Sequence, residues 1–171
     1  MPIISSTVEG LLLINKSVSH SSFRLVSAAR KRFNVKKIGH AGTLDPFASG
    51  VMILLVGRNY TKLSNLFLNQ TKSYQGRILL GKATDTFDCE GTITSTSEHI
   101  PSLSDIESVI EEFQGTISQI PPMYSAKKIN GQRLYKLARQ GIEVERAPVI
   151  LEVETTVISY EYPHLDIEVS C

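Results

Sequence analysis

The sequence predicts an α+β fold in which helices flank a mixed, mostly antiparallel sheet. Two apolar runs, residues 10–14 and 51–56, suit buried strands and are far too short to cross a membrane. Residues 149–153 and 165–169 alternate apolar and polar side chains, which is typical of antiparallel strands. A length of 171 residues suits one domain, which we expect to span residues 1–171 with no second domain.

The first helix is expected over residues 22–33, with Ser21 or Ser22 as its N-cap. A structured loop is expected over residues 39–50, because this stretch holds three glycines and an Asp-Pro step. A short helix over residues 61–68 is expected to follow the second apolar run. The residues that fall roughly on one face of the first helix are Phe23, Val26 and Phe33.

The middle of the chain predicts a strand and then a helix. Alternation over residues 74–80 indicates a strand with one face inward. Ser104 and Glu107 form a capping-box pattern, and the helical spacing of the apolar residues from Ile106 to Phe113 predicts the helix that follows. Residues 119–142 begin with two prolines and are polar, so we expect a loop followed by a short helix.

Charge is strongly segregated along the chain. Residues 10–84 contain twelve Lys and Arg but a single carboxylate, Asp45. Nearby cations stabilise the charged form of a carboxylate, so Asp45 is expected to stay ionised and available for chemistry. A second basic block without acids lies at residues 119–142. One such block alone would suit a solvated surface as well, but two favour a surface that binds a polyanion.

Several kinds of chemistry have no support. No Gly-rich phosphate loop or dinucleotide fingerprint is present, and the four histidines lack the spacing of a zinc site, so we expect neither a cofactor nor a metal. Asp85 and Asp88 lie in a turn, where hydrogen bonding to the backbone is the commoner role of Asp. Two cysteines without a signal peptide suit the cytoplasm.

Taken singly, the candidate site residues have ordinary explanations. Asp45 before Pro46 is typical of a turn, His40 of a hydrogen-bonded loop, and Tyr74 of a packed strand. The order of the residues around them changes this interpretation. Residues 37–51 read Lys-Ile-Gly-His-Ala-Gly-Thr-Leu-Asp-Pro-Phe-Ala-Ser-Gly-Val, which resembles the signature of the TruB family of tRNA pseudouridine synthases. The resemblance continues through residues 10–16, 72–74, 80–86, 119–126 and 131–141.

This resemblance implies a pseudouridine synthase catalytic fold and an isomerase that needs no cofactor. The implied reaction converts a uridine in the T-arm loop of tRNA, at tRNA position 55, to pseudouridine. Asp45 would be the catalytic nucleophile, Tyr74 would stack on the target base, and His40 would fill the space that the flipped base leaves. Lys16 matches a motif lysine whose role we expect to be structural.

The resemblance also implies how RNA is held. Residues 119–142 match a loop that grips RNA, and tRNA is the implied partner of a monomeric, cytoplasmic protein without a membrane segment. The basic side chains expected to contact tRNA phosphates are Lys127, Lys128, Arg133, Lys136 and Arg139.

The sequence departs from the family pattern in three places. The usual Lys-Pro-x-Gly-x-Thr-Ser is Lys-Ser-Val-Ser-His-Ser-Ser at residues 16–22, which loosens a turn, and the usual Gly-x-Ala-Thr-Lys is one residue longer at residues 57–62. The sequence also stops before the family's Ser-Lys-Gly-Thr-Tyr-Ile-Arg, whose Arg pairs with the catalytic Asp. We therefore expect a C-terminally truncated catalytic domain that alone has an exposed sheet edge and little activity.

Two other functions remain open at this stage. A guide-RNA-dependent pseudouridine synthase shares the Gly-His-x-Gly-Thr-Leu-Asp-Pro signature, although residues 127–141 follow the stand-alone pattern. A non-catalytic RNA-binding module is favoured only by the missing C-terminal part.

Overall fold

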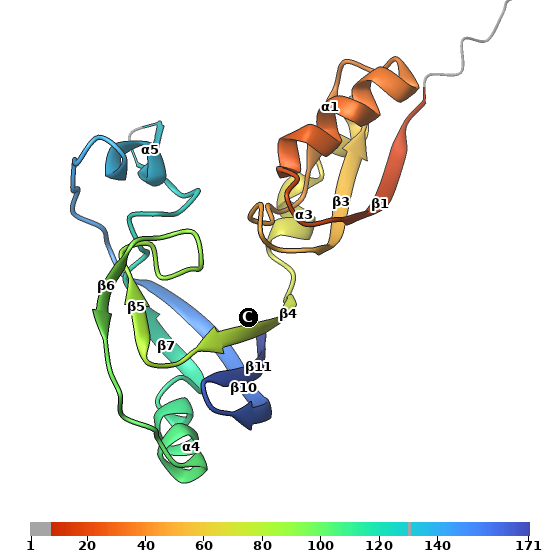
Figure 1. Cartoon of the computed structure of the whole chain (residues 1–171). Coiled ribbons are helices and arrows are strands. Elements are labelled where there is room, and N and C mark those ends of the chain that lie inside the picture. The colour runs from red at the N-terminus through yellow and green to blue at the C-terminus, as the bar shows by residue number, and fades with distance from the viewer. Residues whose placement is uncertain (1–7, 130) are drawn as a thin grey trace, which may run out of the picture. The chain divides into compact units, whose positions relative to one another are not determined.

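The computed structural model describes residues 8–129 and 131–171. The chain is divided into two compact units, Met1–Gln70 and Thr71–Cys171, which are described separately below (Figure 1). Both units combine helices with antiparallel sheets, so the predicted α+β class is confirmed. The single domain expected over residues 1–171 stays a prediction.

The first unit contains a three-stranded sheet in the order β1-β3-β2. Its strands are β1 (Gly10–Lys16), β3 (Gly50–Val56) and β2 (Ile38–His40). Both pairings are antiparallel, and Leu12 lies opposite Leu54 in the register. The two apolar runs therefore pair with each other, although 33 or more residues separate them along the chain.

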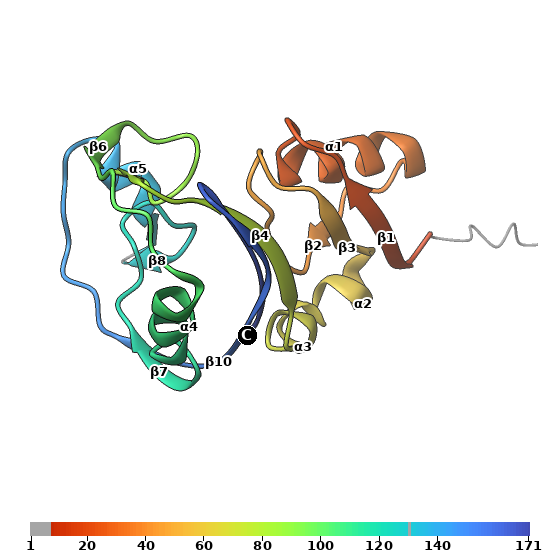
Figure 2. The same ribbon diagram turned by 60° about the horizontal axis from the view of Figure 1, so that its bottom comes forward.

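Helix α1 (Ser22–Phe33) covers one face of this sheet (Figure 2). Its bounds agree with the prediction. The Ser21 side chain accepts a hydrogen bond from the Arg24 amide as the N-cap, and Asn34 ends the helix in a left-handed conformation. The buried side chains between helix and sheet are Val26, Ala29, Ile38, Met52, Leu54 and Val56.

On the opposite face the apolar side chains of β1 and of the start of β3 are exposed, which corrects the expectation of two buried strands, whereas Leu55 near the end of β3 is fully buried. Side chains alternate along β1, so Leu12 and Ile14 pack against the core while Leu11 and Leu13 point to the other face. Leu13 is 67% exposed and Val51 is 71% exposed. An uninterrupted apolar run hid this alternation in the sequence.

Two short helices, and not one, follow β3. They are α2 (Arg58–Thr61) and α3 (Ser64–Leu68), so the single helix expected over residues 61–68 is wrong. Gly57 precedes α2 with φ 88°, and the Glu9 carboxylate accepts hydrogen bonds from the Arg58 amide and the Asn59 side chain. Because of these contacts, helical structure begins at Arg58, before residue 61 where the predicted helix begins.

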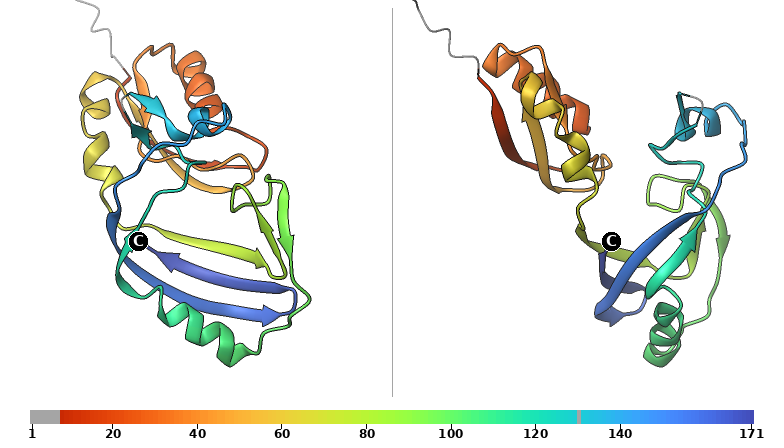
Figure 3. Two further views of the ribbon diagram at one scale, coloured as in Figure 1. Left: turned by 90° about the vertical axis from the view of Figure 1, so that its left-hand side faces the viewer. Right: turned by 180° about the vertical axis from the view of Figure 1, so that it is seen from behind.

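The second unit contains a four-stranded sheet in the order β4-β11-β10-β7 (Figure 3). Its strands are β4 (Ser73–Leu79), β11 (His164–Ser170), β10 (Val149–Glu161) and β7 (Gly115–Gln119). The two C-terminal strands predicted from alternation are thus confirmed. All strand pairings among the described residues are antiparallel, so the expected parallel component of a mixed sheet is not found there.

Helix α4 (Leu103–Glu111) packs against β10. Its capping box uses Ser102 and Asp105, two residues before the predicted pair, because the Ser102 side chain accepts from the Asp105 amide and Asp105 accepts from the Ser102 amide. The sequence contains two Ser-x-x-acid patterns, Ser102 with Asp105 and Ser104 with Glu107. In the structure the earlier pair starts the helix, and Ile106 is buried. After the helix, the Gln114 side chain makes two hydrogen bonds to the backbone of Thr155 in β10.

An apolar groove of about 690 Å³ lies between α4 and one face of the four-stranded sheet. Ile78 of β4 lines this groove together with Ile167 and Val169 of β11. Ile78 is nevertheless 42% exposed, and all seven residues of β4 are exposed. The predicted inward-facing side of β4 therefore faces an open groove and not a closed core.

Two small hairpins complete the second unit, and neither was predicted. The first pairs β5 (Lys82–Thr84) with β6 (Ile93–Thr96). In the turn between them, Asp85 accepts from the Thr92 amide and Asp88 accepts from the Glu90 amide, as expected for turn residues.

The second hairpin pairs β8 (Lys128–Ile129) with β9 (Gln132–Arg133) and leads into α5 (Leu134–Ala138). The short helix after a loop agrees with the prediction, while the hairpin was missed because each of its strands is only two residues long.

Candidate active site

The loop that carries Asp45 is anchored to the start of α1 by a buried lysine. Lys16 is fully buried at the end of β1. Its ammonium donates hydrogen bonds to the carbonyl oxygens of His20 at 2.8 Å, Ser17 at 3.2 Å and Pro46 at 3.3 Å. Three charge-assisted hydrogen bonds offset the cost of burying this cation. The geometry supports a structural role for Lys16, as the sequence predicts.

A serine of α1 holds the residue before Asp45. The Ser22 hydroxyl donates to the Leu44 carbonyl at 2.9 Å and accepts from the Leu44 amide at 3.0 Å. Ser22 is 4% exposed, so water does not compete for these bonds. Because both polar groups of Leu44 are bound, the backbone that leads into Asp45 has a defined direction.

Ser19 contributes a third anchor in an unusual conformation. Its amide donates to the Pro46 carbonyl at 2.8 Å, and its φ is 63°. This is the left-handed region, which glycine adopts most readily. Ser19 stands where the family pattern has Gly, so the turn keeps the glycine conformation without the glycine. The predicted loosening of this turn is not seen.

Asp45 itself is exposed at the tip of this anchored loop. Its carbonyl accepts from the Ala48 amide at 3.1 Å, which closes a tight turn over Pro46. Within residues 8–129 and 131–171, its carboxylate makes no hydrogen bond or ion pair. The carboxylate is therefore unoccupied by other protein groups and accessible to a substrate, and the surrounding basic residues act on it only at longer range.

His40 lies on the same segment, at the end of β2. It pairs with Leu54 of β3 and is partly buried, and its Nδ1 is buried without a hydrogen-bond partner among the described residues. The structure thus places His40 and Asp45 within one unit, separated by the four residues 41–44.

Tyr74 belongs to the second unit, on β4. It lies opposite Val169 of β11, and directly paired residues of antiparallel strands share a face, so Tyr74 is on the groove side of the sheet. Its side chain is 44% exposed. Partial burial raises the pKa of the Tyr74 phenol above its usual 10.0, and an electrostatic interaction with Cys171 adds to this rise. The phenol is therefore protonated at neutral pH.

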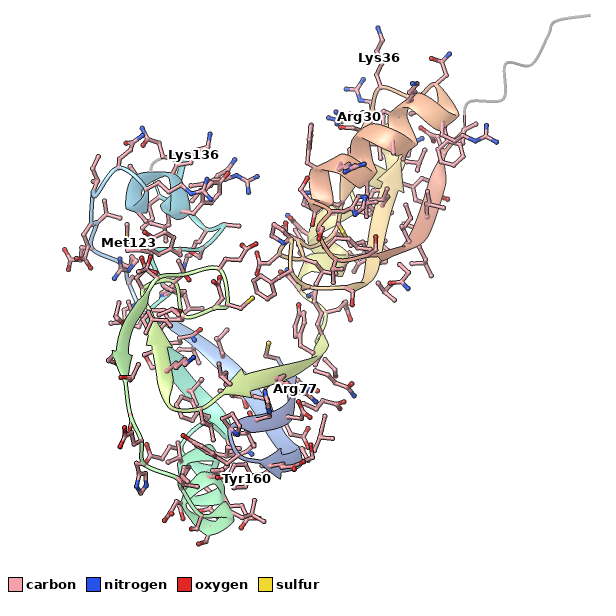
Figure 4. The ribbon with its side chains drawn as sticks, in the orientation of Figure 1. Arg30, Lys36, Arg77, Met123, Lys136 and Tyr160 are labelled. Carbon is pink, nitrogen blue, oxygen red and sulfur yellow. The ribbon has the colours of Figure 1, made fainter. Side chains whose placement is uncertain are left out.

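The five predicted RNA-contacting residues also lie in the second unit, on the β8–β9 hairpin and α5. Leu134 is fully buried beneath them, and its amide donates to the Lys127 carbonyl at 2.9 Å. The Arg139 guanidinium lies 5.6 Å from the centre of the Tyr135 ring. Figure 4 shows Lys136 extending from α5. None of the five forms an ion pair with a described carboxylate, and all but the partly buried Arg133 are exposed.

Two residues of this region were missed in the sequence. Ser22 was considered only as a possible helix cap, and its contact with Leu44 joins residues 22 positions apart. Arg30 is the other, because its guanidinium donates to the Ile38 carbonyl at 2.9 Å beside His40. A signal for Arg30 exists: it follows the buried Val26 by four residues and so lies on the core-facing side of α1.

No group of three or more His, Cys, Asp or Glu that could hold a metal ion is found among the residues that the structure describes. In the same part of the chain, no helix is long and apolar enough to span a membrane.

Comparisons with known proteins agree with the fold and identify the family. Residues 30–171 match the family described as TruB family pseudouridylate synthase (N terminal domain). The class defined by the sheets and the Asp45 loop is therefore that of the pseudouridylate synthases. Within this class, the chain belongs to the TruB family.

Three relatives of similar sequence are all described as tRNA pseudouridine synthase B. The chain is 55% identical over 166 residues to tRNA pseudouridine synthase B of Protochlamydia amoebophila, covering 97% of this chain and 63% of that protein. It is 48% identical to tRNA pseudouridine synthase B of Chlamydia pneumoniae, covering 95% and 69%. The match to the protein of that description from Chlamydia muridarum is 44% identical and covers 100% and 71%. The chain thus spans about two thirds of the length of these relatives.

Solved structures support the fold. A crystal structure of a Cbf5-Nop10-Gar1 complex aligns with a TM-score of 0.66 at 23% identity, covering 94% of this chain and 39% of that chain. A structure of an H/ACA RNP bound to a substrate RNA containing 2'-deoxyuridine aligns with a TM-score of 0.62 at 20% identity, covering 94% and 37%. At these identities the likeness concerns the fold alone.

Proposed function

We propose that this chain acts in a tRNA pseudouridine synthase that isomerises a uridine in the T-arm loop, with Asp45 as the nucleophile. The observation that carries the proposal is the anchored loop: Lys16, Ser19 and Ser22 fix the backbone on both sides of Asp45, while its carboxylate stays free and exposed. A turn residue with a purely local role would use its carboxylate to bond its own backbone.

The reaction rearranges atoms without adding any. The bond between N1 of uracil and C1′ of ribose breaks, and uracil leaves with the electron pair as a delocalised anion. The base then turns and forms a bond from its C5 to C1′. The proton on C5 is lost to a base and N1 gains a proton, so no cofactor is needed. The Asp45 carboxylate either attacks C1′ and is displaced when C5 bonds to C1′, or assists removal of a sugar proton that is returned when the same bond forms.

Tyr74 and His40 are proposed to handle the base. The protonated Tyr74 phenol, on the exposed β4, can stack on uracil and move a proton during the rearrangement. His40 is proposed to fill the space that the uracil leaves when it flips out of the RNA loop, since flipping costs a few kcal/mol of stacking.

The basic segment is proposed to bind tRNA phosphates through the five side chains predicted from the sequence. Leu134 fixes the hairpin and α5 to each other, and the charges above it are not neutralised by described carboxylates. This arrangement suits contacts to phosphates that do not depend on the base sequence. A monomer that acts on tRNA in the cytoplasm follows from the same proposal.

The test is the Asp45→Asn variant of the protein, assayed on an unmodified T-arm stem-loop. Pseudouridine formation should fall to background, while RNA affinity stays within about twofold, because Asn keeps the size of the side chain but cannot attack. Asp166→Asn is the matched control, since it removes a carboxylate outside the loop.

Activity on this hairpin without any guide RNA or partner protein would exclude the guide-dependent alternative. If the full-length protein that contains this chain binds the hairpin but forms no pseudouridine, the enzyme proposal is wrong and the non-catalytic RNA-binding module is favoured.

A further inference from the structure

A pocket of about 330 Å³ opens within the first unit, at the free edge of β2. Its lining includes Arg30 of α1, His40 of β2, and Thr61 and Ser64 of the two short helices. Phe23 of α1 also lines the pocket, and its side chain is 63% exposed. The pocket thus combines two nitrogen-bearing side chains, two hydroxyls and an exposed aromatic ring.

Arg30 enters this pocket with its charge unneutralised. One of its terminal nitrogens donates to the Ile38 carbonyl, and its guanidinium lies 5.8 Å from the centre of the Phe23 ring. Its Nε is buried and has no hydrogen-bond partner among the described residues, and no described carboxylate lies within ion-pair distance. Guanidinium carries five N–H donors, so several remain for a ligand.

Besides Arg30, the polar side chains of the lining are His40, Thr61 and Ser64, and the remaining lining residues are apolar or glycine. The Nδ1 of His40 is buried without a described partner, and Thr61 and Ser64 add two hydroxyls to the same lining. No Asp or Glu lines the pocket. Residues 1–70 contain nine Lys and Arg against two carboxylates, Glu9 and Asp45, and the Glu9 carboxylate is engaged at the start of α2. No carboxylate of the lining therefore opposes an anion that enters the pocket.

We propose that the pocket between Arg30, His40 and Ser64 binds a phosphate group carried by a nucleotide. A guanidinium binds phosphate with two parallel hydrogen bonds, and hydroxyl and imidazole groups complete such sites. The volume is at the lower end of the range that holds small-molecule ligands, about 300–1,000 Å³, so it exceeds the need of a bare phosphate. The Phe23 ring offers a surface on which an unstacked base can lie.

The phosphate has two sources, a free nucleotide or the backbone of an RNA. The second source rests on the proposed function and adds to it a phosphate contact in the unit that carries Asp45. A phosphate held at Arg30 would fix one nucleotide of the RNA loop relative to the Asp45 segment, because β2 connects the pocket directly to that segment.

The first experiment is a titration of the isotope-labelled protein with inorganic phosphate and with uridine monophosphate, followed by NMR. Both ligands should shift the Arg30 Nε–H and His40 ring signals, and uridine monophosphate should also shift the Phe23 ring signals. Arg30→Gln should abolish these shifts. Arg32→Gln, an exposed cation of the same helix, should retain them. Unmoved Arg30 and His40 signals at millimolar ligand would overturn the proposal.

The second experiment measures affinity for the T-arm stem-loop as a function of salt. With an RNA source, Arg30→Gln weakens binding about tenfold and reduces the salt slope by about 0.7 to 1, the value for one phosphate contact, whereas Arg32→Gln changes both less. If Arg30→Gln and Arg32→Gln bind the RNA with the same affinity and salt slope, but Arg30→Gln no longer shows NMR shifts on adding phosphate, the ligand is a free nucleotide.

Ser64→Ala, which removes one hydroxyl from the pocket, repeats both measurements without touching the hydrogen bond between Arg30 and Ile38. Ser64→Ala replaces Arg30→Gln as the test if Arg30→Gln does not fold. Unchanged phosphate and RNA binding by Ser64→Ala would then contradict phosphate binding in this pocket. Neither titration requires turnover. If the full-length protein that contains this chain lacks pseudouridine synthase activity but still binds phosphate here, the proposed function is refuted and this inference stands.

Discussion

The Ser22 hydroxyl bonds both the carbonyl and the amide of Leu44, at 2.9 and 3.0 Å, and so fixes the residue that precedes Asp45. One small side chain at the start of α1 thereby determines the path of a loop 22 residues further along the chain. The same two bonds give the first prediction.

Ser22→Ala should slow pseudouridine formation more than it weakens RNA binding. Removing the hydroxyl leaves two buried polar groups of Leu44 unpaired, which costs about 1–3 kcal/mol of unfolding free energy for each and lets the Asp45 segment move. Single-turnover rates and RNA affinity, measured side by side, check this. Ser21→Ala is the control, because it removes the helix cap without touching Leu44. Equal rates for the two variants would contradict a positioning role for Ser22.

Ser19→Gly should stabilise the protein by about 1 kcal/mol. Ser19 has φ 63°, where a side chain costs about 1–2 kcal/mol and glycine costs little. Urea unfolding measures the change. Ser17→Gly, at a neighbouring residue that does not have a positive φ, should lower stability instead. A loss of stability in Ser19→Gly would mean that the left-handed turn is absent in solution.

Changing Lys127, Lys128 and Arg133 together to Gln should weaken RNA binding for all sequences tested. Each phosphate contact contributes about 0.7–0.9 to the slope of log affinity against log salt, so the triple variant should lose about 2–3 in slope. Fluorescence titration at several salt concentrations measures it. Arg77→Gln removes a charge that Asp166 already neutralises and should leave the slope unchanged. An unaltered slope in the triple variant would remove this segment from the RNA interface.

The stability of the second unit should depend on pH through Asp166. Arg77 donates to both carboxylate oxygens, at 2.7 and 2.8 Å, and lowers the pKa of Asp166 from 3.8 to about 2. A lowered pKa in the folded state gives stability that is present above pH 3.8 and is lost as the pH falls through about 2. The effect should be small, because the pair is on the surface.

Melting temperatures of the unaltered protein and of Asp166→Asn should therefore differ at pH 6 and converge near pH 2. A difference of the same size at both pH values would show that the ion pair is not the cause.

Local patterns predicted the elements whose stability is local. Helix α1 agrees with its predicted bounds because the Ser21 cap and the spacing of Val26 and Phe33 are read directly from the sequence, although Phe23, assigned to the same face, is 63% exposed. The order of the sheets required contacts over long distances, such as that of Leu12 with Leu54, and the exposed faces of β1 and β4 could not be told from buried ones by hydrophobicity alone.

For the candidate site, the motif located Asp45 and His40, but the side chains that hold them come from elsewhere. Ser22 and Arg30 act through bonds to the backbone of Leu44 and Ile38, which no periodicity reveals. Hydrogen bonds of this kind depend on how the helix docks on the sheet, so they appear only once the fold is known.

Lys16 has a chemical consequence of its own. An amine that is fully buried and already bonded to three carbonyls is shielded from reagents that acylate lysines at the surface. Its modification requires the Asp45 loop to detach from the start of α1, since Pro46 supplies one of those carbonyls. The rate at which Lys16 becomes labelled, relative to the exposed Lys31, therefore measures how often the Asp45 loop opens.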